Sequence, residues 1–185
     1  MPSEQLERVL QAIDAYNEQD PRHYEKPYSE QLTRWVLTLK PDASEALRIT
    51  ARGQHIGRWT VPRDSYPMNR GGYLRWREDL KRFHAKTVVG IMEQAGYSPE
   101  ACERVRQIIL KKNIQGDPDT QALEDALCLI FLESQFEEMK RKTPDEKMID
   151  IIRKTWRKMS EPGRKAALAL KLPPEHETLI QAALR

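Results

Sequence analysis

Prolines divide this chain into segments of helical length. Twelve of them fall between stretches whose apolar residues recur at spacings of three and four, and no stretch shows sustained strand alternation. An interior proline removes a helical hydrogen bond and clashes with the preceding turn, so prolines tend to mark helix boundaries. The sequence therefore predicts an all-α fold, with helices near residues 3–18, 28–39, 43–58, 71–95, 98–112, 119–141, 145–158, 161–170 and 174–184.

Size and composition favour a single-domain multi-helix bundle over residues 1–185. A chain of 185 residues, 39% hydrophobic and 32% charged, can bury a core of its own, and no hinge-like linker divides it. Its two cysteines lack metal-site spacing, which favours a reducing compartment. Because the sequence shows neither a secretory leader nor a run of about 18 apolar residues, we expect a cytoplasmic protein with no membrane partner.

Two segments should form the centre of the core. Between Tyr73 and Ile91, apolar residues recur at helical spacing and form one stripe. The run Ala-Leu-Cys-Leu-Ile-Phe-Leu at residues 126–132 is apolar on all sides, which is typical of a buried helix. We therefore expect four of these side chains to be core residues: Trp76, Leu80, Leu127 and Phe131.

Basic residues concentrate in the segment from Arg48 to Arg82. The net charge of the chain is only +3, too small to indicate a nucleic-acid-binding protein by itself, but this segment holds nine basic and three acidic residues. It should attract anions. The segment also contains the longest irregular stretch, from Thr60 to Arg70, and loops of this length are often functional.

One predicted helix carries a candidate anion-binding face. Arg48, Arg52 and His55 are spaced i, i+4 and i+7, so on a helix they share one side. Gly53 and Gly57 weaken the same helix and suggest that a ligand or another backbone approaches it closely. The alternative is that the arginines pair with surface acids while the glycines admit a packed helix.

Two acidic residues and a second histidine complete the candidates. Asp125 shares a helical face with apolar residues, so it should point inward, where an unpaired carboxylate is costly. A metal, a histidine or an arginine could be its partner. Glu124 is the neighbouring candidate and could face water. His84 lies at the edge of the core stripe, where a lone histidine is more often structural than a ligand.

Several stretches of the sequence match one protein family. They are Ser44–Ile49, Gln54–Ile56, Arg58–Trp59, Pro62–Pro67, Gly72–Arg77, Phe83–Ala85 and Leu123–Glu133. Through them nearly the whole chain resembles the family named domain of unknown function 4202. The family name implies no activity.

More distantly, the order of helices over roughly residues 28–135 resembles the HD-domain superfamily of metal-dependent phosphohydrolases. In that superfamily a histidine, a His-Asp doublet and a late aspartate bind a divalent metal. The resemblance implies an HD-domain-like core, with helices of 145–184 packed on it. It also implies catalytic roles for His55, at the doublet histidine, and Asp125, at the late aspartate. Ile56 stands where the doublet has its aspartate.

The first functional hypothesis is a metal-dependent hydrolase acting on a small phosphorylated or nucleotide-like substrate. A divalent ion such as Mn, Mg, Fe or Zn would lower the pKa of bound water for attack on phosphorus. The expected metal ligands are His55, His84, Glu124, Asp125 and Glu30, the last near the place of the superfamily's first histidine. Guanidinium forks suit phosphate, and the expected substrate-binding residues are Arg48, Arg52, Arg58, Arg63 and Trp59. An iron-dependent oxidation is also compatible with the resemblance.

The second hypothesis is a non-catalytic helical module. It would bind a nucleotide, RNA or another anion through the same arginines together with Trp59, Tyr73 and Trp76. The third hypothesis is an interaction protein whose aromatics belong to the core and whose charges are solvated. The first hypothesis requires His55 and Asp125 to approach each other across a pocket to which Arg48 and Arg52 contribute. The sequence leaves the oligomeric state open.

Overall fold

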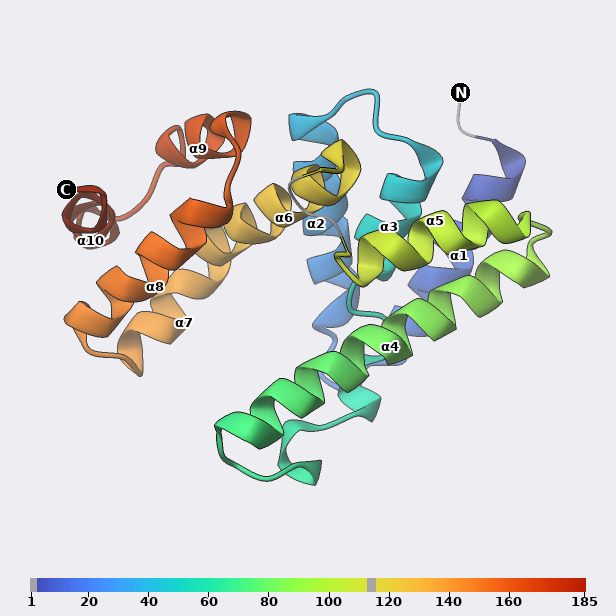
Figure 1. Ribbon diagram of the computed structural model, residues 1–185, viewed down its shortest axis with the longest axis horizontal. Coiled ribbons are helices and arrows are strands. Elements are labelled where there is room, and N and C mark those ends of the chain that lie inside the picture. Colours follow the sequence, from blue (N-terminus) through green and yellow to red (C-terminus); the bar gives the residue numbers. More distant parts are fainter. Residues whose placement is uncertain (1–2, 113–115) are drawn as a thin grey trace.

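The computed structural model describes residues 3–112 and 116–185, and in these ranges every regular element is helical (Figure 1). The α-helices are α1 Glu4–Asn17, α2 Glu25–Leu39, α3 Glu45–Gly53, α4 Arg70–Gln94, α5 Pro99–Ile109, α6 Pro118–Ile130, α7 Phe136–Arg141, α8 Asp145–Lys158, α9 Glu161–Leu168 and α10 Pro174–Leu184. Two 3-10 turns, Arg58–Thr60 and Arg63–Ser65, precede α4, and a π-helical turn, Phe131–Gln135, joins α6 to α7. The all-α prediction is confirmed for this part of the chain. None of these helices is long and apolar enough to cross a membrane.

Local sequence signals explain where the helices begin. The side chain before the first helical residue accepts a hydrogen bond from a backbone N–H of the first turn in six helices, and so satisfies a group that has no partner within the helix. These capping residues are Ser3, Ser44, Asn69, Ser98, Asp117 and Ser160. A proline occupies one of the first two positions in each of α5, α6, α9 and α10, where no helical hydrogen bond is lost.

Helix α3 ends at Gly53, five residues before its predicted end. The chain then turns, and Gly57 adopts a φ of 65°, a left-handed conformation that favours glycine. A Cβ atom at Gly57 would also lie 2.9 Å from the ring of Phe83. A Cβ atom at Gly53 would lie 2.4 Å from Cγ2 of Val88 on α4. The close approach expected at Gly53 is therefore made by a packed helix.

Three clusters of buried side chains form a continuous interior. The first joins α1, α3, α4 and α5, and the second joins α2, α3, α5 and α6. The third covers α6 to α10. Ala46 packs against both the first and the second cluster, while Trp35 and Leu39 pack against both the second and the third. The helices therefore form one compact domain, in which α6 contacts both α2 and α8 (Figure 1).

Two of the four expected core residues are buried, and two are not fully so. Trp76 and Leu80 lie in the interior, as predicted. Leu127 and Phe131 are only half-buried, because this side of α6 and the π-helical turn borders a cavity. The apolar run at 126–132 therefore does not have a packed neighbour on every side.

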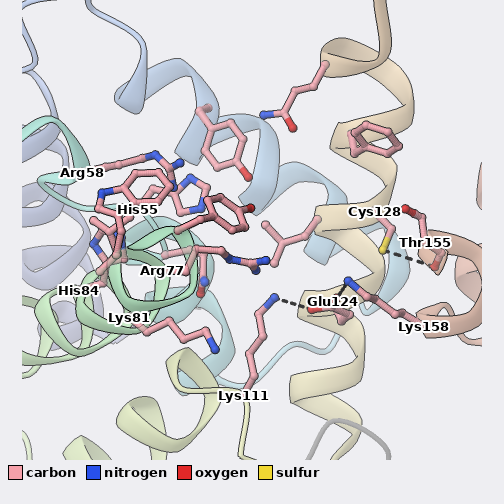
Figure 2. A pocket seen from close by; sticks show the side chains of 18 of the residues that line it. His55, Arg58, Arg77, Lys81, His84, Lys111, Glu124, Cys128, Thr155 and Lys158 are labelled. Atoms are coloured by element: carbon pink, nitrogen blue, oxygen red, sulfur yellow. Dashed lines mark hydrogen bonds and ion pairs between the residues drawn. The ribbon is translucent and has the colours of Figure 1, made fainter. Parts of the chain in front are cut away.

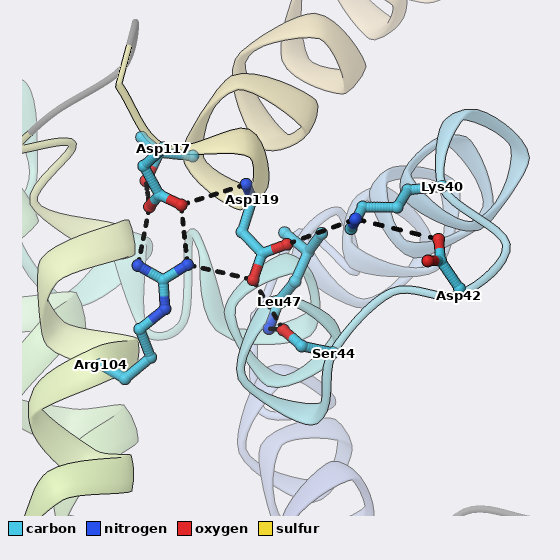
Figure 3. Close-up of polar contacts among 8 residues, drawn as sticks. Lys40, Asp42, Ser44, Leu47, Arg104, Asp117 and Asp119 are labelled. Atoms are coloured by element: carbon cyan, nitrogen blue, oxygen red, sulfur yellow. Dashed lines mark hydrogen bonds and ion pairs between the residues drawn. The ribbon is translucent and has the colours of Figure 1, made fainter.

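A polar network fixes the start of α6 (Figure 3). Arg104 of α5 donates two hydrogen bonds of 2.8 Å to Asp117 and one of 3.1 Å to Asp119. Asp119 also accepts a hydrogen bond of 2.8 Å from the hydroxyl of Ser44, before α3. The bond from Arg104 lowers the pKa of Asp117 to about 2, so the pair stays charged. The network joins α5, α6 and the start of α3.

Candidate functional site

A cavity of about 390 Å³ opens between α4 and the segment from α6 to α8. Figure 2 shows Arg77, Lys81 and His84 on its α4 side and Glu124, Cys128 and Lys158 on the opposite side. The turn after α3 and the turn after α5 supply further wall residues. The cavity thus forms where helices from the two halves of the sequence meet.

The wall of the cavity is strongly cationic. Among the described residues that line it, one is acidic, Glu124, and five are basic: Arg58, Arg77, Lys81, Lys111 and Lys158. The guanidinium of Arg58 lies 4.8 Å from the ring centre of Trp76, and that of Arg77 lies 5.7 Å from the ring centre of Tyr73. In the described ranges neither arginine has a carboxylate within ion-pair distance.

Glu124 binds two of the lysines. Its carboxylate pairs with Nζ of Lys111 through one oxygen and lies 3.6 Å from Nζ of Lys158 through the other. Burial alone would raise the pKa of Glu124, but the two lysines outweigh burial and hold this pKa below its usual range. Glu124 is therefore ionised at neutral pH. The sequence left open whether Glu124 faces water, and the structure shows that its side chain is buried.

Two neutral histidines lie in the wall beside Arg58. The ring of His55 stacks on that of Tyr28, with ring centres 4.6 Å apart. Nδ1 of His84 donates a hydrogen bond of 2.7 Å to the carbonyl oxygen of Ile56. Burial and the nearby positive charge of Arg58 hold the pKa of His55 well below its usual value, and burial lowers the pKa of His84 to about 4.

Glu25 lies behind His55 in the interior. Its Oε2 atom is 4.0 Å from Nδ1 of His55, and neither carboxylate oxygen has a hydrogen-bond partner among the described residues. Burial raises the pKa of Glu25 to about 7. The sequence did not indicate Glu25, because the predicted helix begins at residue 28 and leaves Glu25 in the preceding loop, whereas α2 begins at Glu25.

Asp125 does not join His55 at the cavity. Its carboxylate accepts hydrogen bonds from the backbone N–H of Ser160 at 2.8 Å, from the Ser160 hydroxyl, and from the Gln121 amide at 3.0 Å. Asp125 thus points inward as predicted, but its partner is the start of α9, not a metal, a histidine or an arginine. The expected convergence of His55 and Asp125 on one pocket is wrong.

The predicted Arg-Arg-His face is also absent. Arg52 forms two hydrogen bonds, of 2.6 and 2.9 Å, with Asp14 of α1, and its Nη2 atom lies 4.0 Å from Glu30. Arg48 is half-buried on α3, outside the lining of the cavity. Because α3 ends at Gly53, His55 does not continue the face of the two arginines. Arg52 therefore fits the alternative of pairing with an acid.

The remaining expected binding residues line a second cavity. This cavity, of about 590 Å³, includes Trp59 and Arg63 and shares Arg58 and Trp76 with the first. Arg63 donates hydrogen bonds to the carbonyl oxygens of Tyr66 and Pro67, at 3.1 and 2.9 Å. Its guanidinium therefore holds the loop before α4 in place.

The expected metal ligands do not come together. His55, His84 and Glu124 line the cavity, but Glu124 is bound by two lysines, and Asp125 and Glu30 lie elsewhere. Across residues 3–112 and 116–185, no three histidine, cysteine, aspartate or glutamate side chains are grouped as a metal ion requires. The side chains present therefore do not fit the expected metal centre.

Four cationic residues of the cavity were not selected from the sequence: Arg77, Lys81, Lys111 and Lys158. Arg77 and Lys81 follow Tyr73 at intervals of four on α4, so a second face beside the apolar stripe could have indicated them. Lys111 and Lys158 meet only through tertiary packing. No local pattern predicts that contact.

The family model described as Domain of unknown function (DUF4202) matches residues 7–180 of the chain. No curated protein and no solved structure matches the chain. The match includes every residue that lines the cationic cavity. The chain therefore belongs to the DUF4202 family.

Proposed function

We propose that this protein binds a small phosphorylated molecule, such as a nucleotide, in the cationic cavity. The observation that carries the proposal is that Arg58 and Arg77 lie in its wall without a carboxylate partner in the described chain. Phosphate oxygens match the fork of guanidinium N–H donors and would supply the missing negative charge.

The rest of the wall suits an organic part of such a ligand. Tyr73 and Phe131 bring aromatic rings to the cavity, and Leu127 adds aliphatic surface. Phe131 and Leu127 are only half-buried, so part of their apolar area stays open to a ligand. Small-molecule sites commonly combine such apolar surface with a few placed polar groups. A nucleobase is one group of the right character.

Calorimetric titration of the full chain with pyrophosphate and ATP tests this proposal. Replacing both arginines, Arg58→Gln with Arg77→Gln, should weaken binding at least tenfold, since a hydrogen bond to a charged group contributes about 1.5–3 kcal/mol. Arg34→Gln is the matched control, because Arg34 is exposed and pairs with Glu133 outside the cavity. Binding that is absent in the unsubstituted chain, or equal in the double variant, would contradict the proposal.

Hydrolysis of the bound ligand is a second candidate function. With it we propose that the helices are arranged as in an HD domain. Hydrolysis is favoured by His55, a neutral imidazole in the cavity wall that makes no hydrogen bond to the described protein. His55 would take a proton from water as the water oxygen bonds to phosphorus. The phosphorus–oxygen bond to the leaving group would break, and that group would then receive the proton.

Phosphate release from pyrophosphate and from p-nitrophenyl phosphate tests this second candidate, with Mn²⁺ or with a chelator. His55→Asn should abolish release while pyrophosphate binding remains. If the unsubstituted protein binds pyrophosphate but releases no phosphate under either condition, the pocket is a binding site only.

A further inference from the structure

Lys111 adopts a backbone conformation that normally belongs to glycine. Its φ is 54°, in the left-handed region, at the second residue after the end of α5, directly after the capping residue Leu110. Hydrogen bonds from its N–H to the Ile108 carbonyl and from the Lys112 N–H to the Gln107 carbonyl close the helix there. This closing position favours glycine, because a Cβ atom is sterically unfavourable at positive φ. A lysine at this position points to a role for its side chain.

The side chain of Lys111 enters the cationic cavity and meets Lys158 there. Their ammonium groups approach the two different oxygens of Glu124, so one carboxylate serves both lysines. Only 7% of the Glu124 side chain is exposed, against 17% for Lys111 and 56% for Lys158. The carboxylate is therefore the deepest of the three groups, and the ammonium groups lie closer to solvent.

The two ammonium groups have hydrogen-bond donors that no described residue uses. Each has three N–H bonds. Within the described residues, each approaches a single acceptor group, the Glu124 carboxylate. At least two N–H bonds on each lysine are thus left for another acceptor. The three groups together carry one net positive charge, because Glu124 is ionised.

We propose that Lys111 and Lys158 form a second phosphate subsite of the cavity, additional to Arg58 and Arg77, and that Glu124 is the positioning residue that holds both ammonium groups in place. This inference rests on the proposed function. A phosphate at this subsite would accept the free N–H bonds of both lysines. It would also connect the turn after α5 to the end of α8.

The variant Glu124→Gln distinguishes positioning from simple charge attraction. Removing a negative charge makes the cavity more positive, so charge alone predicts tighter binding of pyrophosphate. If Glu124 positions the lysines, the variant should instead bind pyrophosphate at least fivefold more weakly in calorimetric titration. Lys154→Gln is the matched control on α8, since Lys154 pairs with Asp150 outside the cavity and should bind as the unsubstituted protein does. Equal or tighter binding by Glu124→Gln would overturn the positioning role.

The variant Lys111→Gly tests the subsite in a chain that remains folded. It removes the ion pair to the buried Glu124 carboxylate, which lowers stability, but glycine suits the left-handed conformation and offsets part of that loss. The variant should therefore still unfold cooperatively, while pyrophosphate binding falls at least tenfold. Lys111→Arg keeps the charge and should restore part of the affinity. Unchanged binding by Lys111→Gly would overturn the subsite. Failure of the unsubstituted chain to bind pyrophosphate would instead overturn the proposed function, and the subsite with it.

Discussion

Glu25 is an ionisable residue kept inside the protein without a hydrogen-bond partner in the described chain. Charged groups face it from several elements: Arg58 of the first 3-10 turn, and Asp20 and Arg22 before α2. Arg58 and Arg22 favour the ionised form, but burial outweighs them and raises its pKa from 4.5 to about 7. The folded state therefore holds a proton on Glu25 at pH values where the unfolded chain has lost it.

This residue should make the folded state less stable as the pH rises from 4.5 to 7. Between these values the folded state binds more protons than the unfolded state, so the free energy of unfolding falls with rising pH. The difference of about 2.5 pH units corresponds to about 3 kcal/mol. Glu25→Gln should remove this loss, so its stability relative to the unsubstituted protein should rise by about that amount between pH 4 and pH 8.

Denaturant unfolding at a series of pH values measures this effect. His84 has the opposite influence, because burial lowers its pKa from 6.5 to about 4 and its contribution is lost as the pH falls through this range. The comparison between variant and unsubstituted protein cancels that contribution. A stability difference that does not change with pH would show that Glu25 titrates normally.

At the scale of single elements, α9 depends on a side chain from α6. Asp125 accepts hydrogen bonds from the backbone and the hydroxyl of Ser160, the residue that caps α9. Asp125→Ala should lower the free energy of unfolding by about 2 kcal/mol, because it leaves buried donors without acceptors. Denaturant unfolding measures the loss. An unchanged stability would show that water replaces the carboxylate without cost.

Gly163 provides an independent check on the same contact. A Cβ atom at this position would lie 2.6 Å from Cγ of Asp125. Gly163→Ala should therefore also destabilise the protein, although alanine is the better helix former. Stabilisation by this substitution would show that α9 can move away from α6.

Most helices could be predicted because their signals are local. Ser98 and Pro99 mark the start of α5, and Ser160 marks the start of α9, through contacts within a few residues. The end of α3 could not be predicted in the same way. Gly57 looks like a packing glycine within a helix, but the structure uses it for a left-handed turn against Phe83. That turn depends on a neighbour 26 positions away in the sequence.

At the scale of the whole molecule, the three buried clusters should unfold together. Some side chains, such as those of Ala46 and Trp35, each pack against two of the clusters and so connect them. We expect differential scanning calorimetry to show one transition, with equal calorimetric and van't Hoff enthalpies. Two separate transitions would indicate that α8–α10 unfold independently of the first two clusters.

The candidate site could be predicted only in part. The cationic segment from Arg48 to Arg82 does supply Arg58, Arg77 and Lys81 to the cavity. Which of its basic residues reach the cavity depends on tertiary structure, since Arg52 instead pairs with Asp14. Lys111 and Lys158 are 47 positions apart and meet at one buried carboxylate. Periodicity within a helix carries no information about such a meeting.

The π-helical turn at Phe131–Gln135 has an evolutionary consequence. Such a turn contains one residue more than the α-helical turn it replaces. Loss of a single codon there would leave a regular α-helical turn, and α7 would keep its orientation relative to α6, because the wider π-helical turn absorbs the extra residue. Met139, which lines the cavity beyond the turn, would stay in the wall, whereas the side chains of the turn itself that line the cavity, Phe131 and Gln135, would be rearranged. One small deletion could therefore give a descendant of this protein a differently shaped binding site on an otherwise unchanged body.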